Sequence, residues 1–217
     1  RILLLNQCEP PDLKGLPVTD HEQGVVRYLK DNTLPRDVNS RGILFFDEIN
    51  TASGDVANAA MTLLLNRALD DYQVPPQWII VAAGNLESDQ AFVDSLSSAM
   101  SNRFIHYQLT PCLQQWLAFA KNYQVTPSIT DFVTKHPEYL HNMHVEETLQ
   151  RGWPSPRSWI LLHDMIKAAG GVDQLDPYLL KATVYGAVGQ TVGHIFCDFL
   201  ETYAMWMSPE IFYEDPA

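Results

Sequence analysis

One run of residues constrains this chain more than any other: the apolar stretch GILFF over residues 42–46, followed at once by Asp47 and Glu48. A continuous apolar run of this length, without alternating polar residues, is typical of a strand buried on both faces. Such strands belong to parallel sheets whose faces are covered by helices. We therefore predict a central strand that delivers two adjacent carboxylates to its carboxyl end.

Three further segments have strand patterns, with helical patterns between them. Residues 1–6 contain four consecutive apolar residues, 78–83 (WIIVAA) form a second buried run, and 105–109 (IHYQL) alternate apolar and polar side chains. Apolar residues recur at helical spacing over about 53–68, and a second helical stretch is expected over 92–100. Strands that alternate with helices at this interval favour a parallel sheet with helices on its faces.

The pattern changes after the last strand candidate. Four segments that follow it have helical patterns, with no further strand pattern among them: 116–123, 129–135, 158–169 and 179–207. We therefore expect an α/β core domain over residues 1–111 and an all-helical domain over 112–217. A chain of 217 residues is long enough to form two such lobes.

The charge balance limits the partners of the chain. Lysine and arginine total 14 against 26 aspartate and glutamate residues, a net charge of −12, which gives no overall electrostatic reason to bind nucleic acid or an anionic membrane. Cys8, Cys112 and Cys197 have neither zinc nor disulfide spacing. No apolar run approaches the ~18 residues of a membrane span. We expect a cytoplasmic protein without a membrane span.

Asp47 and Glu48 are the first candidates for chemistry. In open α/β sheets, ligands bind beyond the carboxyl ends of the strands, so both carboxylates would face the ligand crevice. Nucleotide hydrolysis needs one acid that holds Mg²⁺, which keeps several waters, and a second that orients or deprotonates the attacking water. Asp47 suits the first role and Glu48 the second. Alternatively, both carboxylates merely cap the following helix.

Three more polar residues lie at the boundaries of expected elements. Asn85 follows the strand over 78–83, and its amide can donate to a phosphate oxygen and accept from water. Arg103 precedes the expected strand over 105–109, and Arg157 begins a helix of the second domain. The planar guanidinium group matches phosphate. The simpler alternatives are a turn residue for Asn85 and surface or carboxylate-paired side chains for the arginines.

Taken in order, these residues resemble the motifs of AAA+ ATPases. Asp47 and Glu48 after a buried strand are similar to a Walker B motif, and Asn85 is similar to a sensor 1 residue. Arg103, in the run SNRF, resembles an arginine finger, and Arg157, in the run PSPR, resembles the start of a sensor 2 helix. Each motif alone is unspecific, whereas the ordered set is specific.

Within that superfamily the chain resembles MoxR-like ATPases. The resemblance rests on the runs LNQ at 5–7 and DLKGLP at 12–17, on residues 42–50, and on the run NRAL at 66–69. It covers about residues 1–200 and implies a partial parallel-sheet P-loop NTPase core followed by a helical lid domain.

The resemblance also implies roles for the site residues. ATP and Mg²⁺ would be the cofactors, with Asp47 holding Mg²⁺ through water and Arg157 sensing the nucleotide from the lid. Glu48, Asn85 and Arg103 would be catalytic, and Arg103 would reach a neighbour's site. The family implies a homo-oligomeric ring, often a hexamer, that remodels or matures a client protein, commonly with a von Willebrand factor A domain partner.

One motif of the family is missing, because no G-x-x-x-x-G-K-[ST] run occurs in the sequence. The family places that phosphate-binding loop before the strand that here spans residues 1–6. Without it, the cradling amides, the lysine on the phosphates and the hydroxyl on Mg²⁺ are lacking. We therefore expect a truncated product or fragment that is inactive as an ATPase by itself. The alternative is a non-hydrolysing adaptor or assembly module on the same scaffold; a metal-dependent hydrolase that uses Asp47 and Glu48 without nucleotide lacks a supporting ligand set.

Two weaker patterns have simpler interpretations. His141 and His144 have a spacing that could place two imidazoles on one helical face, but zinc requires further fixed ligands, so a solvated turn fits better. The aromatic residues of the helical half lie mostly at helical spacing without a basic groove. We expect them to pack the core of that domain and not to stack on bases.

Overall fold

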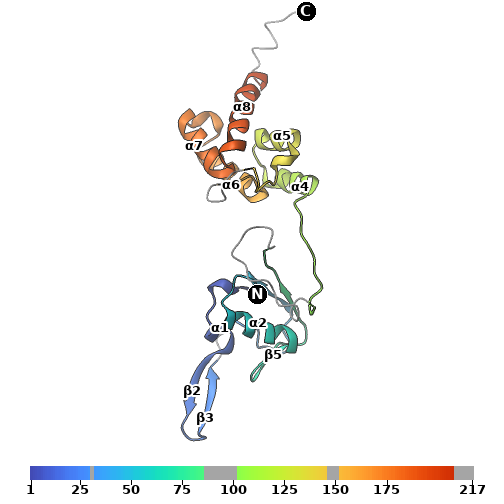
Figure 1. Ribbon diagram of the computed structural model, residues 1–217, viewed down its shortest axis with the longest axis vertical. Helices are drawn as coiled ribbons and strands as arrows, with labels where there is room; N and C mark the ends of the chain where they lie inside the picture. Colours follow the sequence, from blue (N-terminus) through green and yellow to red (C-terminus); the bar gives the residue numbers. More distant parts are fainter. Residues whose placement is uncertain (30–31, 86–101, 146–151, 208–217) are drawn as a thin grey trace, which may run out of the picture. The chain divides into compact units, whose positions relative to one another are not determined.

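The computed structural model of the chain describes residues 1–29, 32–85, 102–145 and 152–207 (Figure 1). Contacts divide the chain into two compact units, Arg1–Tyr107 and Gln108–Ala217. The domain boundary expected after residue 111 falls in the irregular segment before the first helix of the second unit. Each unit is described by itself.

The first unit is built on a parallel sheet of three strands in the order β1–β4–β7. These strands are β1 (Ile2–Leu4), β4 (Gly42–Asp47) and β7 (Trp78–Ala82). The register aligns Leu4 with Asp47, so the carboxyl ends of β1 and β4 meet at one edge. The predicted central strand is confirmed, because β4 pairs with a neighbour on each side. The expected burial on both of its faces is wrong, because Ile43 is exposed.

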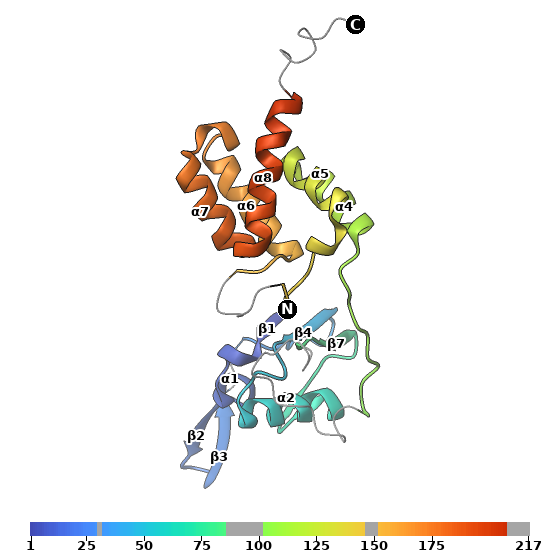
Figure 2. The same ribbon diagram turned by 45° about the horizontal axis from the view of Figure 1, so that its top comes forward.

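The two faces of this sheet differ in burial. Leu44 and Phe46 are fully buried in a core that includes Val56 and Leu63 of α2 (Gly54–Asn66), which runs along one side of the sheet (Figure 2). On the opposite face, alternate apolar side chains are exposed: Ile2 by 74%, Leu4 by 40%, Ile43 by 53%, Ile79 by 64% and Val81 by 39%. This exposed face therefore has the apolar composition of a buried surface. Parallel sheets ordinarily have both faces covered.

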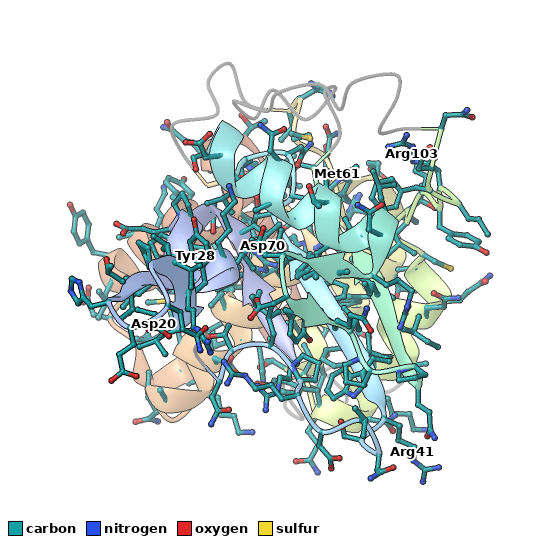
Figure 3. The ribbon with its side chains drawn as sticks, turned by 90° about the horizontal axis from the view of Figure 1, so that it is seen from below. Asp20, Tyr28, Arg41, Met61, Asp70 and Arg103 are labelled. Carbon is teal, nitrogen blue, oxygen red and sulfur yellow. The ribbon has the colours of Figure 1, made fainter. Side chains whose placement is uncertain are left out.

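A β-hairpin precedes the central strand and projects from the first unit (Figure 1). It follows β1, the 3-10 helix η1 (Leu5–Gln7) and α1 (Pro10–Lys14), and consists of β2 (Leu16–Asp20) and β3 (Val25–Leu29). The Asp20 carboxylate accepts the turn amides of Glu22 and Gln23 and pairs with Arg27 at 3.2 Å. Figure 3 shows Asp20 and Tyr28 among the outward side chains of this arm.

The helix expected over 53–68 ends earlier than its pattern predicts. α2 stops at Asn66, and Arg67 adopts a left-handed conformation with φ 53°. The Arg67 guanidinium donates to the carbonyls of Pro75 at 3.2 Å and Trp78 at 2.7 Å, which fixes the turn. A short hairpin of β5 (Ala68–Leu69) and β6 (Tyr72–Gln73) then leads to β7.

The strand expected over 105–109 is wrong for this structure, which has an irregular, extended segment there. Its alternating apolar side chains are almost fully exposed, with Ile105 at 82%, Tyr107 at 83% and Leu109 at 92%. A strand needs a neighbour for its backbone hydrogen bonds, and no strand of the described residues pairs with this segment. The helix expected over 92–100 lies outside the described residues.

The described part of the second unit is helical, as expected. Its α-helices are α4 (Leu113–Tyr123), α5 (Pro127–Lys135), α6 (Pro156–Ala168), α7 (Pro177–Val188) and α8 (Gln190–Met207), with 3-10 turns η3 (Pro137–Tyr139) and η4 (Val172–Gln174). Three of these helices begin with proline, which is preorganised for the first helical position. The single helix expected over 179–207 is wrong, because Gly189, at φ 86°, ends α7 and separates it from α8.

Aromatic side chains fill the core of the second unit, which confirms that expectation for the buried members. Phe132, Trp159 and Phe196 are fully buried. The Phe132 ring lies 5.5 Å from Trp159 and 5.0 Å from Phe196, centroid to centroid, in tilted and edge-to-face arrangements. Such contacts stabilise a core beyond the area they bury.

Candidate active site

The two carboxylates that follow the central strand do not share one environment. Asp47 ends β4 and accepts the backbone N–H of Glu48 on Oδ1 at 3.0 Å. Glu48 has a φ of 59°, in the left-handed region that non-glycine residues rarely adopt. Strain of this kind costs roughly 1–3 kcal/mol and clusters at functional sites. The chain therefore turns sharply at Glu48 as it leaves the sheet.

Glu48 and Asn85 meet at the carboxyl edge of the sheet. The Asn85 carboxamide donates from Nδ2 to Glu48 Oε2 at 3.0 Å. The Thr51 hydroxyl donates to the same oxygen at 2.8 Å and lies 3.1 Å from the Glu48 carbonyl oxygen. Two donors thus hold one oxygen of the carboxylate. The structure brings together the residues from the ends of β4 and β7 that the sequence singled out.

Asn50 ties the two strand ends together. Its Nδ2 donates to the carbonyl of Asn85 at 2.7 Å, and its Oδ1 accepts the Asn85 N–H at 3.1 Å. The backbone adds a third link, since the N–H of Ile49 donates to the carbonyl of Ala83 at 3.0 Å.

Sequence reasoning missed Thr51 and Asn50 as contributors to the site. A hydroxyl three residues after an acid is a local signal for a side-chain bond to the backbone. The Asn50 contact joins residues 35 positions apart, and no local pattern indicates it.

Within the described ranges, no group of three or more His, Cys, Asp or Glu side chains is arranged to hold a metal ion. Asp47 and Glu48 are two adjacent carboxylates, which fits Mg²⁺ held by one carboxylate with waters and phosphate oxygens and not by an all-protein cage. His141 and His144 lie in a turn, where His141 packs edge-on against Trp153.

Neither of the two predicted arginines takes part in the hydrogen bonds described above. Arg103 is exposed in a turn of the first unit (Figure 3), next to Phe104, which packs against the core. Arg157 is exposed at the start of α6, where Ser155 and Ser158 form a capping box. It belongs to the second unit, and its role toward a nucleotide stays a prediction.

Comparisons with solved structures give distant likenesses, one of which is described here. The chain is similar to the crystal structure of a candidate ATPase from Cytophaga hutchinsonii, with 15% sequence identity, a TM-score of 0.38, and coverage of 92% of this chain and 76% of that one. No protein-family model matches the chain, and no curated protein matches it. Because the TM-score is low, the function proposed below rests on the chain's own geometry and motifs.

None of the described helices combines the length and the apolar character that crossing a membrane requires.

Proposed function

We propose that this chain supplies the catalytic carboxylate edge of a MoxR-like AAA+ ATPase, which hydrolyses ATP once a phosphate-binding loop is joined to it. The observation that carries the proposal is the hydrogen bond between Asn85 and Glu48, which lie 37 positions apart at the ends of neighbouring strands. Ligands of open α/β sheets bind beyond such strand ends. The assignment to the MoxR-like family rests on the order of the motifs in the sequence.

Each residue of this edge has a distinct task in the proposal. Bound ATP and Mg²⁺ supply the phosphoryl group and the positive charge that neutralises it. Asp47 holds the hydrated ion. Glu48 would orient and deprotonate the attacking water, with Oε2 held by Thr51 and Asn85. Asn85 positions the carboxylate and a phosphate oxygen together.

The topology of the sheet supports a phosphate-binding loop beside β7. The strands β1, β4 and β7 lie side by side in the same order as in the chain. Right-handed crossovers between strands in this order place all the connections on one face of the sheet. To cover the exposed apolar face, a further element would have to enter from the opposite direction, beyond the edge of β7 that no strand of the described residues pairs with. With such an element, the strand order would reverse beside β7. Ligands of doubly wound sheets bind where the strand order reverses, which would here be next to Asn85.

The proposal extends to assembly by family resemblance. A homo-oligomeric ring would place the exposed Arg103 of one subunit in the site of its neighbour, and Arg157 would serve its own nucleotide from the helical unit. The ring would remodel or mature a client in the cytoplasm, with a von Willebrand factor A domain protein as the candidate partner. Nothing in the net charge of −12 favours a nucleic acid instead.

The test compares this chain with the protein expressed from its complete reading frame. Titration calorimetry with MgATP should give weak or no binding for the chain alone, because the phosphate-binding loop carries most phosphate contacts. The complete protein should hydrolyse ATP if the loop is in frame. Tight Mg²⁺-dependent binding by the chain alone would contradict the dependence on the loop. Binding without turnover in a loop-containing protein would favour the non-hydrolysing adaptor.

A further inference from the structure

We propose that Asn50 is a positioning residue, which fixes the Asn85 carboxamide on Glu48 by clamping the main chain of Asn85. This inference rests on the proposed function and adds a residue that the motifs do not assign.

The clamp uses both polar atoms of the Asn50 side chain. Nδ2 donates to the Asn85 carbonyl at 2.7 Å, while Oδ1 accepts the Asn85 N–H at 3.1 Å. Two opposed bonds to one residue fix its rotation as well as its distance. The Asn85 side chain therefore leaves the backbone in one direction, which leads to Glu48 Oε2.

Gly84 makes room for this clamp. A Cβ atom at Gly84 would lie 2.5 Å from Asn50 Oδ1 and 2.9 Å from Asn50 Cγ, closer than any real contact. The φ of Gly84 is not in the left-handed region, so the close approach of the Asn50 carboxamide is what requires a residue without a side chain.

The clamp links two chain segments that must move together. Residues 48–51 carry Glu48 and Thr51, and residues 83–85 carry the amide that reaches Glu48. Without Asn50, the Thr51 hydroxyl still donates to Glu48 Oε2, but the Asn85 carboxamide is free to rotate away from it. The Glu48 carboxylate then samples orientations that do not face the water, and turnover falls while nucleotide contacts persist.

The first arm of the test uses the chain as it is, with ¹⁵N-labelled protein. In an Asn50→Ala variant, the backbone amide of Asn85 should exchange with solvent about tenfold faster or more, and its two carboxamide protons should shift toward the positions of a solvent-exposed asparagine. The amides of Phe46 and Ala82 should exchange as before. Asn50→Asp should retain the bond from the Asn85 N–H and lose the bond to its carbonyl, with an intermediate effect. Asn58→Ala, on the exposed side of α2, is the matched control.

The second arm measures ATP hydrolysis by the protein from the complete reading frame. Asn50→Ala should lower kcat by about 10- to 100-fold with little change in KM, because a misdirected catalytic group slows the chemical step. Asn58→Ala should leave both constants unchanged.

The two arms separate the possible failures. Unchanged Asn85 signals in Asn50→Ala overturn the clamp, and changed signals with a normal kcat overturn its role in catalysis. If the unsubstituted complete protein does not hydrolyse ATP, the proposed function fails, whereas the Asn85 signals still decide whether the clamp exists.

Discussion

The Asn85 carboxamide donates a 3.0 Å hydrogen bond to the carboxylate of Glu48, which the Thr51 hydroxyl also holds at 2.8 Å on the same oxygen. Glu48 makes these contacts from a left-handed backbone conformation, with φ 59°. A strained residue with a restrained side chain at the end of a central strand is typical of a preorganised site.

The two adjacent acids should fail in different ways when each is made neutral. In the complete protein, Glu48→Gln should abolish ATP turnover and leave nucleotide binding nearly intact, because it removes the water-activating carboxylate and keeps its shape. Asp47→Asn should instead weaken the Mg²⁺ dependence. Steady-state hydrolysis and calorimetry at several Mg²⁺ concentrations measure both effects. An equal loss of ATP affinity in the two variants would refute the assigned roles.

Arg103 should act in the site of a neighbouring subunit. An arginine finger supplied in trans is worth on the order of 10³ or more in rate, so Arg103→Ala in the complete protein should bind ATP without hydrolysing it. Mixing Arg103→Ala subunits with Glu48→Gln subunits should recover partial activity where an intact finger meets an intact site. Arg157→Ala should not be rescued in this way. No recovery in mixed rings, with assembly confirmed by mass, would mean that Arg103 acts within its own subunit or is structural.

The backbone of Glu48 should prefer glycine to alanine. Both substitutions remove the contacts to Thr51 and Asn85, but only glycine adopts a φ of 59° without steric cost. Glu48→Gly should therefore be more stable than Glu48→Ala by about 1 kcal/mol, the reverse of the usual order. Urea unfolding of this chain measures the difference. A more stable alanine variant would show that the left-handed conformation is not kept.

His163 makes the second unit sensitive to acid. The side chain is 2% exposed, and Nδ1 accepts the backbone N–H of Thr126 at 3.1 Å, with the Thr126 hydroxyl at 2.9 Å. Nε2 is buried, has no hydrogen-bond partner among the residues that the structure describes, and lies 4.0 Å from Asp164 Oδ1. Desolvation lowers the pKa of His163, Asp164 raises it in opposition, and Lys167 lowers it further.

The lowered pKa sets the direction of the pH dependence. Below the unfolded pKa of about 6.5, the unfolded chain binds a proton that the folded chain does not, so stability falls as the pH drops and is independent of this group above it. His163→Asn, which keeps an acceptor near Thr126, should reduce this acid sensitivity, while the exposed His144→Asn should not. Thermal unfolding between pH 5 and pH 8 checks both, and equal slopes in all three proteins would exclude His163 as the cause.

The expected helix and strand patterns succeeded where local chemistry decides the structure. The GILFF run became the central strand because a run this apolar favours the interior of a sheet, although Ile43 remains exposed. The pattern over 105–109 predicted a strand from alternating apolar and polar side chains. It failed because a strand exists only where a neighbour takes up its hydrogen bonds, and side-chain alternation does not provide that neighbour.

The sequence by itself determined where the candidate polar residues fall: two acids at the end of a central strand, an amide after the next one, and arginines at element boundaries. Tertiary structure alone decided how they are held. The Asn85 carboxamide on the Glu48 carboxylate and the Asn50 clamp on Asn85 depend on the close approach of segments more than 30 residues apart. Their geometry follows from the pairing of β4 with β7, because parallel pairing in register brings the ends of both strands to one edge.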